Sequence, residues 1–338
     1  MKLLIKKIIS LFYFILYKTN MLLYASGFLK TYKPNNVFVI GVGNISVGGS
    51  GKTPFVRLLS KYLETKKHKP CIVSGGYKKK SPGEIIINGN NISSLVAQNV
   101  GDEPFMLAKE LPHLSVYVGS KLKNIKQIDR KKIFSHAIID DGYQSFSIKK
   151  DYSVLLIDLS VSLKKYRLLP VGFLREPLSE IKRANLIVFT KTNLCSDSDL
   201  KVKKIFFEKH INFKKQSVVD SSIKALLFSA VKEKLTLVQN AGFLQKTKYV
   251  SFSGIANPKS FLALQKKLKV KPYKNFNFKD HYEYPLKSIN RIVGFSKKNN
   301  IKTILTTKKD YYKICNFFQS FNIYVLEIEH VLSENIDI

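Results

Sequence analysis

The residues best placed to do chemistry lie in a glycine-rich turn that precedes a lysine and a threonine. The segment NVFVIGVGNISVGGSGKTP starts with an apolar run rich in β-branched residues, Val37 to Val42, which predicts a buried strand. Four glycines follow, then Lys52 and Thr53, and then Pro54, which suits the first turn of a helix because its missing N–H would have no partner there. This order predicts a phosphate-binding loop, in which backbone N–H groups and the helix N-terminus face the phosphates.

One position of this loop departs from the usual spacing, because Ser46 stands where a glycine is expected five residues before Gly51. The lysine and the threonine are still in register with the strand and the helix, so we favour nucleotide binding over a glycine turn without a ligand. The lysine would reach the β and γ oxygens, and the threonine hydroxyl would ligate Mg²⁺. The residues predicted to bind ATP are Ser46, Val47, Gly48, Gly49, Ser50, Gly51, Lys52 and Thr53.

A second candidate site follows the apolar strand expected at residues 137–139, which ends in Asp140 and Asp141. An acidic residue at the carboxyl end of a buried strand, downstream of a phosphate loop, commonly holds Mg²⁺ directly or through water. A polar strand end with an Asx-type turn is the alternative. We predict that Thr53, Asp140 and Asp141 form the metal site.

Other polar residues have ordinary explanations that compete with chemistry. Asp102 and Glu103 are expected at the start of a helix, where negative charge is favourable in any protein. Arg175 and Glu176 lie in a proline-containing loop and could contact a substrate or form a surface ion pair. His281 lies in an aromatic-rich loop, and a lone histidine is more often structural than catalytic.

Composition narrows the class of protein. The 338 residues suffice for two domains, and a hydrophobic content of 45% is typical of a folded globular protein. The net charge is +33, and only six of the 57 basic residues are arginine. This charge can reflect a genome-wide preference for lysine, or it can mark an anionic partner such as a phosphorylated lipid or a membrane. No nucleic-acid-binding motif accompanies it, so no nucleic acid partner is expected. Three widely separated cysteines indicate reduced core residues.

The N-terminal segment, residues 1–33, combines lysines with aliphatic and aromatic residues and contains no acid. Its apolar run from Ile8 to Tyr17 is too short to span a bilayer, and Lys18 interrupts it. We predict a helix that lies in the membrane interface. A tilted span and a helix packed on the protein's own core are the alternatives, and a cleaved signal peptide is disfavoured because the phosphate loop follows so closely.

The order of expected elements predicts an α/β fold with a P-loop NTPase-like parallel sheet, since a strand, a helix and a strand follow within about 40 residues. Further buried strands are expected at 152–160 and 185–193, and EIIINGNNI suggests a hairpin with its turn at 88–91. A second, smaller α/β lobe follows. The expected divisions are an N-terminal membrane-associated helix (1–33), a kinase core (34–220) and a C-terminal lobe (221–338).

Taken together, the motifs resemble one family, the tetraacyldisaccharide 4'-kinases of lipid A biosynthesis. The motifs are VGNISVGGSGKTP, SGGY, GDEP, DDGYQ, LLPVGFLREP, FSGIANP, KDHYEY and TTKKD, and their order covers nearly the whole chain. The family loop also carries a small hydroxyl residue at the position of Ser46. The sequence departs from the family pattern at Gly75, at Lys78 and Lys79, and at Ser145, where the family commonly has histidine.

The resemblance implies ATP-dependent phosphorylation of the 4'-hydroxyl of an acylated glucosamine disaccharide 1-phosphate, which yields the bisphosphorylated lipid A precursor. It also implies roles for two residues: Asp102 takes the hydroxyl proton, and His281 from the second lobe supports Asp102. Lys52, expected from the loop pattern to hold the phosphates, completes the predicted catalytic set. The residues expected near the substrate are Tyr77, Glu103, Gln144, Arg175 and Glu176.

The expected location is the cytoplasmic face of the inner membrane, where the substrate and ATP meet. The rival is a membrane-attached P-loop ATPase or GTPase that acts as a switch without a small-molecule acceptor. A guanine-specific Asn-Lys-x-Asp motif would favour this rival, and TKTN at 190–193 matches that motif poorly.

Overall fold

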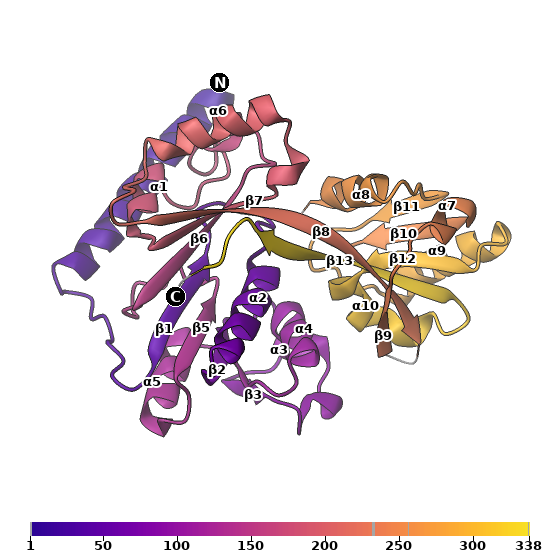
Figure 1. The fold of residues 1–338 in the computed structure, drawn as a ribbon, viewed down its shortest axis with the longest axis horizontal. Coiled ribbons are helices and arrows are strands. Elements are labelled where there is room, and N and C mark those ends of the chain that lie inside the picture. The colour runs from indigo at the N-terminus through magenta and orange to yellow at the C-terminus, as the bar shows by residue number, and fades with distance from the viewer. Residues whose placement is uncertain (1, 232–233, 256, 337) are drawn as a thin grey trace.

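One mixed sheet runs through the molecule and joins two lobes (Figure 1). The computed structural model describes residues 2–231, 234–255, 257–336 and 338. Met1, at the start of the expected N-terminal segment, and Ala256, in the FSGIANP motif, lie outside the described residues. Within the described residues the sheet has 13 strands with helices packed against it, so the predicted α/β class is confirmed.

The first lobe is a largely parallel sheet in the order β3-β4-β2-β5-β1-β6-β7-β8, in which only β3 runs antiparallel to its neighbour β4. Its strands before β8 are β1 (Phe38–Gly43), β2 (Pro70–Ser74), β3 (Ile85–Ile87), β4 (Val116–Val118), β5 (His136–Asp140), β6 (Tyr152–Asp158) and β7 (Leu186–Thr190). Its helices are α1 (Lys2–Ala25), α2 (Lys52–Thr65), α3 (Ala97–Val100), α4 (Asp102–Glu110), α5 (Lys121–Lys131) and α6 (Asp197–Glu208). The central strands are continuous apolar runs because helices cover both of their faces.

Two hydrophobic clusters show this covering. Helix α2 packs Phe55 and Leu59 against one face of the sheet, where Ile40 of β1 and Ile138 of β5 point. Helix α5 packs on the other face, where Val39 of β1 lies. The loop between β1 and α2 therefore lies at the carboxyl end of a strand buried in the middle of the sheet, where ligands bind in folds of this kind.

The second lobe continues the sheet as β11-β10-β12-β13, and β13 pairs with β8 in antiparallel fashion. Its strands are β8 (Ser217–Val231), β9 (Lys234–Val238), β10 (Tyr249–Ser253), β11 (Lys274–Asn277), β12 (Thr303–Thr307) and β13 (Asn322–Leu332). Its helices are α7 (Phe243–Lys246), α8 (Pro258–Lys267), α9 (Leu286–Lys298) and α10 (Lys308–Ile314). Strand β8 passes through residue 220, and the boundary expected there stays a prediction.

One expectation for local structure is wrong. The segment EIIINGNNI does not form a hairpin, because β3 pairs instead with Val116–Val118 of β4, and a 3-10 turn at Ile92–Ser94 follows. The helix expected in the N-terminal segment is present and is continuous over Lys2–Ala25, so it extends beyond the apolar run Ile8–Tyr17 on both sides. The stretch Leu3–Ala25 is long and apolar enough to cross a membrane, judged by length and composition alone.

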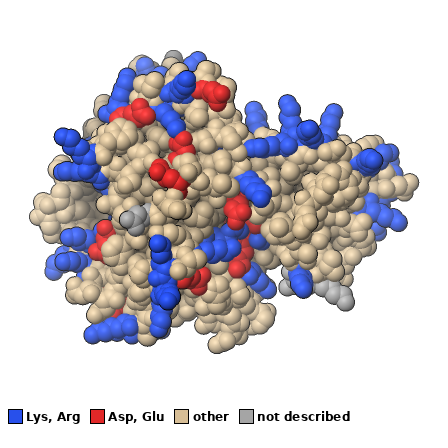
Figure 2. Space-filling model, in the orientation of Figure 1, with Lys and Arg blue, Asp and Glu red and all other residues tan. Residues whose placement is uncertain are grey.

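Basic side chains are spread widely over the surface. Figure 2 shows lysine and arginine side chains on both lobes of the face in view, with fewer acidic side chains between them. This distribution differs from a single basic patch, which is the usual footprint of a nucleic-acid-binding site. The absence of a nucleic acid partner stays a prediction.

Candidate active site

The glycine-rich loop links the end of β1 to the start of α2, which begins at Lys52. Gly48 and Gly51 have φ angles of 114° and 88°, in the left-handed region that favours glycine. A Cβ atom on Gly51 would also lie 2.5 Å from the His330 ring of β13. Two independent reasons therefore require a glycine at position 51: its backbone conformation and the close approach of the His330 ring.

The loop is held from the protein side through three of its carbonyl groups. Lys191 Nζ donates to the carbonyl of Gly49 at 2.7 Å, and Thr190 Oγ1 donates to that of Ser50 at 3.2 Å. His330 Nε2 lies 2.9 Å from the carbonyl of Gly51, and its Nδ1 lies 2.7 Å from Ser221 Oγ. Since a carbonyl can only accept, Nε2 of His330 carries the proton. These bonds hold the carbonyl side of the loop against β7 and β13.

His330 makes the stability of this region depend on pH. Burial lowers the pKa of the His330 imidazole to about 4, against an ordinary value of 6.5. The unfolded chain binds this proton at a higher pH than the folded protein does, so the contribution to stability is complete above about pH 6.5 and falls as pH drops towards 4. We expect His330→Gln to remove up to about 3 kcal/mol of this pH dependence.

Urea unfolding of both proteins between pH 7 and pH 4 measures the effect. The control is His113→Gln, since the side chain of His113 is more than half exposed. An unchanged pH slope for the His330 variant would contradict the prediction.

Two carboxylates at the end of β5 face the loop. Asp141 has a φ of 51° and accepts two hydrogen bonds from Arg175, of 2.9 and 3.0 Å. Its Oδ1 also lies 3.5 Å from Lys52 Nζ. Burial opposes ionisation of Asp141, but the bonds from Arg175 and the charge of Lys52 hold its pKa well below the usual range. Asp141 is therefore ionised at neutral pH.

The pKa of Asp140 is shifted in the opposite direction to that of Asp141. Its side chain is buried, and its Oδ1 has no hydrogen-bond partner among the described residues. Burial, together with the charge of Glu103, raises the pKa of Asp140 to about 7. A buried carboxylate oxygen without a partner beside a phosphate loop is suited to a cation.

Thr53, Asp140 and Asp141 are the residues predicted for the metal site. Within the described ranges, no group of three or more histidine, cysteine and acidic side chains is placed to hold a metal ion without other ligands. Mg²⁺ is commonly held by one or two carboxylates together with the phosphates of the substrate, so the carboxylates at the end of β5 fit this metal. Thr53 is buried in the first turn of α2, and Asp140 Oδ1 has no hydrogen-bond partner among the described residues, so both could serve as ligands; their roles stay predictions. Asp141 is already paired with Arg175, and its role as a ligand stays a prediction.

The third part of the site joins the two lobes. Asp102, the first residue of α4, lies with its Oδ2 2.9 Å from Nδ1 of His281, which follows β11 in the second lobe. His281 has a φ of 57°, which is uncommon outside glycine, and its ring contacts that of Tyr77 edge-on with centroids 4.9 Å apart. The structure therefore brings together Asp102 and His281, which are 179 positions apart in the sequence. Tyr77, one of the residues predicted to lie near the substrate, contacts the same histidine.

Comparison with known proteins agrees with this geometry. The sequence model for tetraacyldisaccharide-1-P 4'-kinase matches residues 3–337. This chain belongs to that family. The tetraacyldisaccharide 4'-kinase of Aquifex aeolicus is 34% identical over 88% of this chain and 86% of its own length. That of Halothermothrix orenii is 31% identical over 92% and 85%, respectively.

A solved structure of the same family also matches. The crystal structure of LpxK from Aquifex aeolicus in complex with ATP superposes with a TM-score of 0.76 and 31% identity, covering 99% of this chain and 96% of that one. The predicted kinase class, the predicted α/β fold with its largely parallel sheet and the resemblance to the tetraacyldisaccharide 4'-kinases are confirmed.

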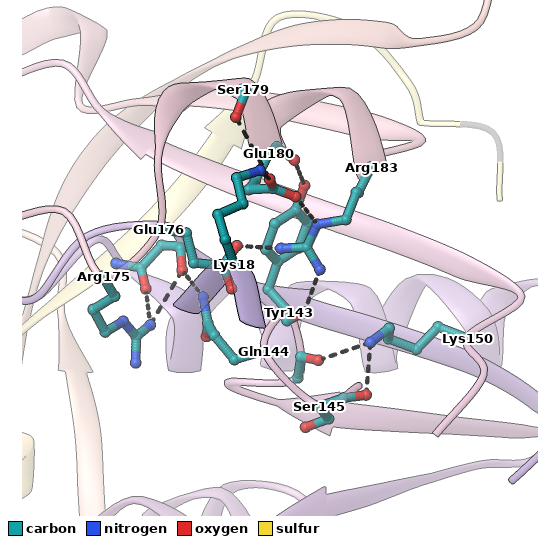
Figure 3. A network of polar contacts seen from close by, with 12 residues as sticks. Lys18, Tyr143, Gln144, Ser145, Lys150, Arg175, Glu176, Ser179, Glu180 and Arg183 are labelled. Atoms are coloured by element: carbon teal, nitrogen blue, oxygen red, sulfur yellow. Dashed lines mark hydrogen bonds and ion pairs between the residues drawn. The ribbon is translucent and has the colours of Figure 1, made fainter. Parts of the chain in front are cut away.

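In this member of the family, Arg175 and Glu176 have different surroundings. Arg175 faces the site and bonds to Asp141 and to Asn44. Glu176 is completely buried and pairs with Arg183, which also forms an ion pair with Glu180 at 3.0 Å. Figure 3 shows Glu176 and Glu180 converging on Arg183. Arg175 thus adjoins the phosphate loop, and direct contact of Glu176 with substrate stays a prediction.

The remaining substrate-side predictions concern Gln144 and Glu103. Gln144 Nε2 donates to the carbonyl of Asn44 at 2.8 Å, directly beside the loop. Glu103 lies 4.0 Å from Lys309 of α10. Contact of either residue with substrate stays a prediction.

Sequence reasoning missed three residues of the site. Asn44 accepts from Lys52 at 3.3 Å through its Oδ1, and also from Arg175, and so links the loop to the carboxylates. Lys309 and Lys313 of α10 contact His281 and Asp102. The motif TTKKD was the available signal for α10, but the motif alone gives no indication of which partners its lysines have.

Proposed function

We propose that the protein transfers the γ-phosphoryl group of ATP to the 4'-hydroxyl of an acylated glucosamine disaccharide 1-phosphate. The supporting observation is the pair formed by Asp102 and His281 across the two lobes, in a chain that also carries the glycine-rich loop and matches the family over residues 3–337. Its relatives are named tetraacyldisaccharide 4'-kinases. An acceptor hydroxyl must meet both a base and a phosphoryl donor, and the arrangement offers both.

The proposed mechanism assigns one task to each group. Lys52 and the loop backbone bind the phosphates, and Arg175 holds Asp141 in place beside Lys52. When bound, Mg²⁺ held through Thr53 and Asp140 would neutralise charge on the phosphoryl oxygens. Asp102 accepts the proton of the hydroxyl, which is a poor nucleophile until its proton is accepted. His281 orients Asp102, and the contact between the lobes limits access of water.

The test of this function is an assay with radiolabelled ATP, with and without the disaccharide acceptor, followed by thin-layer separation. Transfer of label to the acceptor supports the kinase. Hydrolysis of ATP at the same rate without acceptor would support the rival, a P-loop ATPase switch, and would overturn the proposal. Omission of Mg²⁺ with chelation should abolish transfer, and retained transfer would remove the metal from the mechanism.

We infer that α1 lies in the cytoplasmic leaflet of the inner membrane rather than across it. One face of the helix contacts the protein: Tyr13 donates to the carbonyl of Arg175 at 2.6 Å, and Tyr17 contacts Phe146 edge-on. The opposite face is apolar and exposed, and its residues follow helical spacing: Leu4, Ile8, Leu11, Ile15 and Leu22. A helix with one face on protein and one on lipid fits the interface.

The exposed face gives a direct test of this inference. We expect replacement of Leu4, Ile8 and Leu11 by aspartate to lower binding to phospholipid vesicles by at least about 100-fold, since each buried aliphatic side chain contributes about 1.5–3 kcal/mol. Sedimentation with vesicles measures the effect, and Leu237→Asp on exposed β9 is the control. Binding equal to that of wild type would exclude this face as the anchor.

Deletion of residues 1–30 is a less specific version of the same test. It should also release the protein from membranes, but it removes the bond from Tyr13 to Arg175 and the ion pair of Lys18 with Glu180, which is 3.1 Å long (Figure 3). Loss of activity after deletion would therefore combine two causes, whereas the aspartate substitutions leave these contacts intact.

A further inference from the structure

Asp102 has a second partner besides the histidine. Lys313 Nζ lies 2.6 Å from Asp102 Oδ2, the same oxygen that faces His281 Nδ1. Lys313 also donates to the carbonyl of Tyr282 at 3.0 Å, and its side chain is only 5% exposed. One buried ammonium group therefore ties the carboxylate to the segment that carries the histidine.

The helix that carries Lys313 is itself firmly placed. Thr307 caps the N-terminus of α10 by accepting from the N–H of Asp310. The buried carboxylate of Asp310 accepts in turn from Thr307 Oγ1 at 2.6 Å and from the N–H of Gly254 at 2.9 Å. Since α10 is fixed at its first turn, the lysines on its surface have defined positions.

Lys309 lies one helical turn before Lys313 on the same face of α10. Its Nζ lies 3.2 Å from Nε2 of His281 and 3.2 Å from Asp280 Oδ1. Because an ammonium group can only donate, Nε2 of His281 is the acceptor of that bond. The proton of the imidazole is therefore on Nδ1 and points at Asp102.

We propose that Lys313 is a positioning residue that fixes Asp102 and keeps it ionised for proton acceptance. This inference rests on the proposed role of Asp102 as the base. Both contacts occupy Oδ2, so Oδ1 is the oxygen that we expect to meet the acceptor hydroxyl. Asp102 comes from the first lobe, and its partners His281, Lys309 and Lys313 come from the second, so the base is complete only when the lobes are together.

The charges around Asp102 support this assignment. Burial works against its ionisation, but the bond from His281 and the charge and bond of Lys313 hold its pKa below the usual range. The other groups facing it are Lys309, which acts in the same direction, and the phenol of Tyr284. Loss of the Lys313 charge must raise the pKa of Asp102, and the acid limb of activity should move to higher pH.

The experiment compares kcat/KM for the acceptor as a function of pH in wild type, Lys313→Met and Lys313→Arg. For the methionine variant we expect the midpoint of the acid limb to rise by about one pH unit or more, with a larger loss of activity at pH 6 than at pH 9. The arginine variant should recover most of the activity because it keeps the charge. Lys287→Met, on the exposed side of α9, is the matched control, and KM for ATP should not change.

Two results would overturn the inference. One is a methionine variant with the midpoint and kcat of wild type. The other is a loss of activity that is equal at every pH and is not restored by arginine, which would indicate a merely structural role. Asp102→Asn separates this inference from the proposed function: if that variant stays active, the base assignment fails, and if it is inactive while the Lys313 profile is unchanged, only the inference fails.

Discussion

Replacement of Asp102 by asparagine is expected to lower kcat by about 10²–10⁴-fold, the range that general bases contribute. The amide keeps the shape of the side chain and can still accept a hydrogen bond from His281, but it cannot take the proton of the acceptor. KM for ATP should stay near its wild-type value, because no contact joins Asp102 to the phosphate loop among those described for it. Steady-state transfer and ATP binding by calorimetry measure the two effects.

The matched control is Asp197→Asn, an exposed acid in the first turn of α6. It changes the charge by the same amount at the start of another helix, and Asp197 is not among the residues predicted for the site. Asp102→Asn with wild-type kcat would remove Asp102 from the mechanism. Loss of ATP binding in the same variant would show that the carboxylate acts on the nucleotide site and not on the acceptor.

Replacement of Arg57 by methionine is expected to destabilise the protein by about 3–5 kcal/mol, the cost of leaving a buried charge without its partner. Arg57 of α2 bonds to Glu110 of α4 at 2.9 Å and to Glu327 of β13. Lys308 of α10 forms ion pairs with the same two carboxylates, at 2.7 Å from Glu110 and 2.8 Å from Glu327. These four side chains are at most 10% exposed and form a closed ring of alternating charge between the lobes.

Without Arg57, two buried carboxylates would share a single ammonium group. Burial and the charge of Glu110 already raise the pKa of Glu327, and Arg57 opposes this shift. In the variant the pKa should rise further, so a proton bound by the folded state would offset part of the loss. The difference in stability from wild type should therefore shrink as pH falls from 7 towards 5.

Urea unfolding at several pH values measures both effects. Arg130→Met, at an exposed position of α5, is the control and should change stability by less than about 0.5 kcal/mol. Addition of Glu327→Gln to the Arg57 variant should restore part of the stability, since it removes the excess negative charge. A loss for Arg57→Met no larger than that of the control would contradict the importance of the ring.

Local patterns predict the parts of the site that are contiguous in the chain. The glycine turn with Lys52 and the strand end at Asp140 carry their own signals, because β-branched runs, glycines and following acids have local physical causes. Pairing of Asp102 with His281 came only from the family resemblance. No local pattern relates these positions, since their contact depends on how the second lobe docks on the first.

Other features depend on partners that the sequence does not identify. The segment at 85–87 has the composition of a hairpin strand, but it finds a better partner in Val116–Val118. Lys18 interrupts the apolar run of the N-terminal helix, and the sequence does not reveal that its ammonium group pairs with Glu180. Lys313 is one lysine among many in a basic chain, and only the fold shows that this one is buried against a carboxylate.

The antiparallel pairing of β8 with β13 determines whether the chain can be cut into fragments that fold independently. Strand β8 carries the chain out of the first lobe, and β13 brings it back over ten paired residues, Ser221–Ala230 with Ile323–Leu332. After β13, Ile336 is buried in the same cluster as Val219 and the residues of α2. The second lobe is therefore topologically an insertion into the first, so a fragment ending near residue 220 would lack a segment of its own core and should not fold independently.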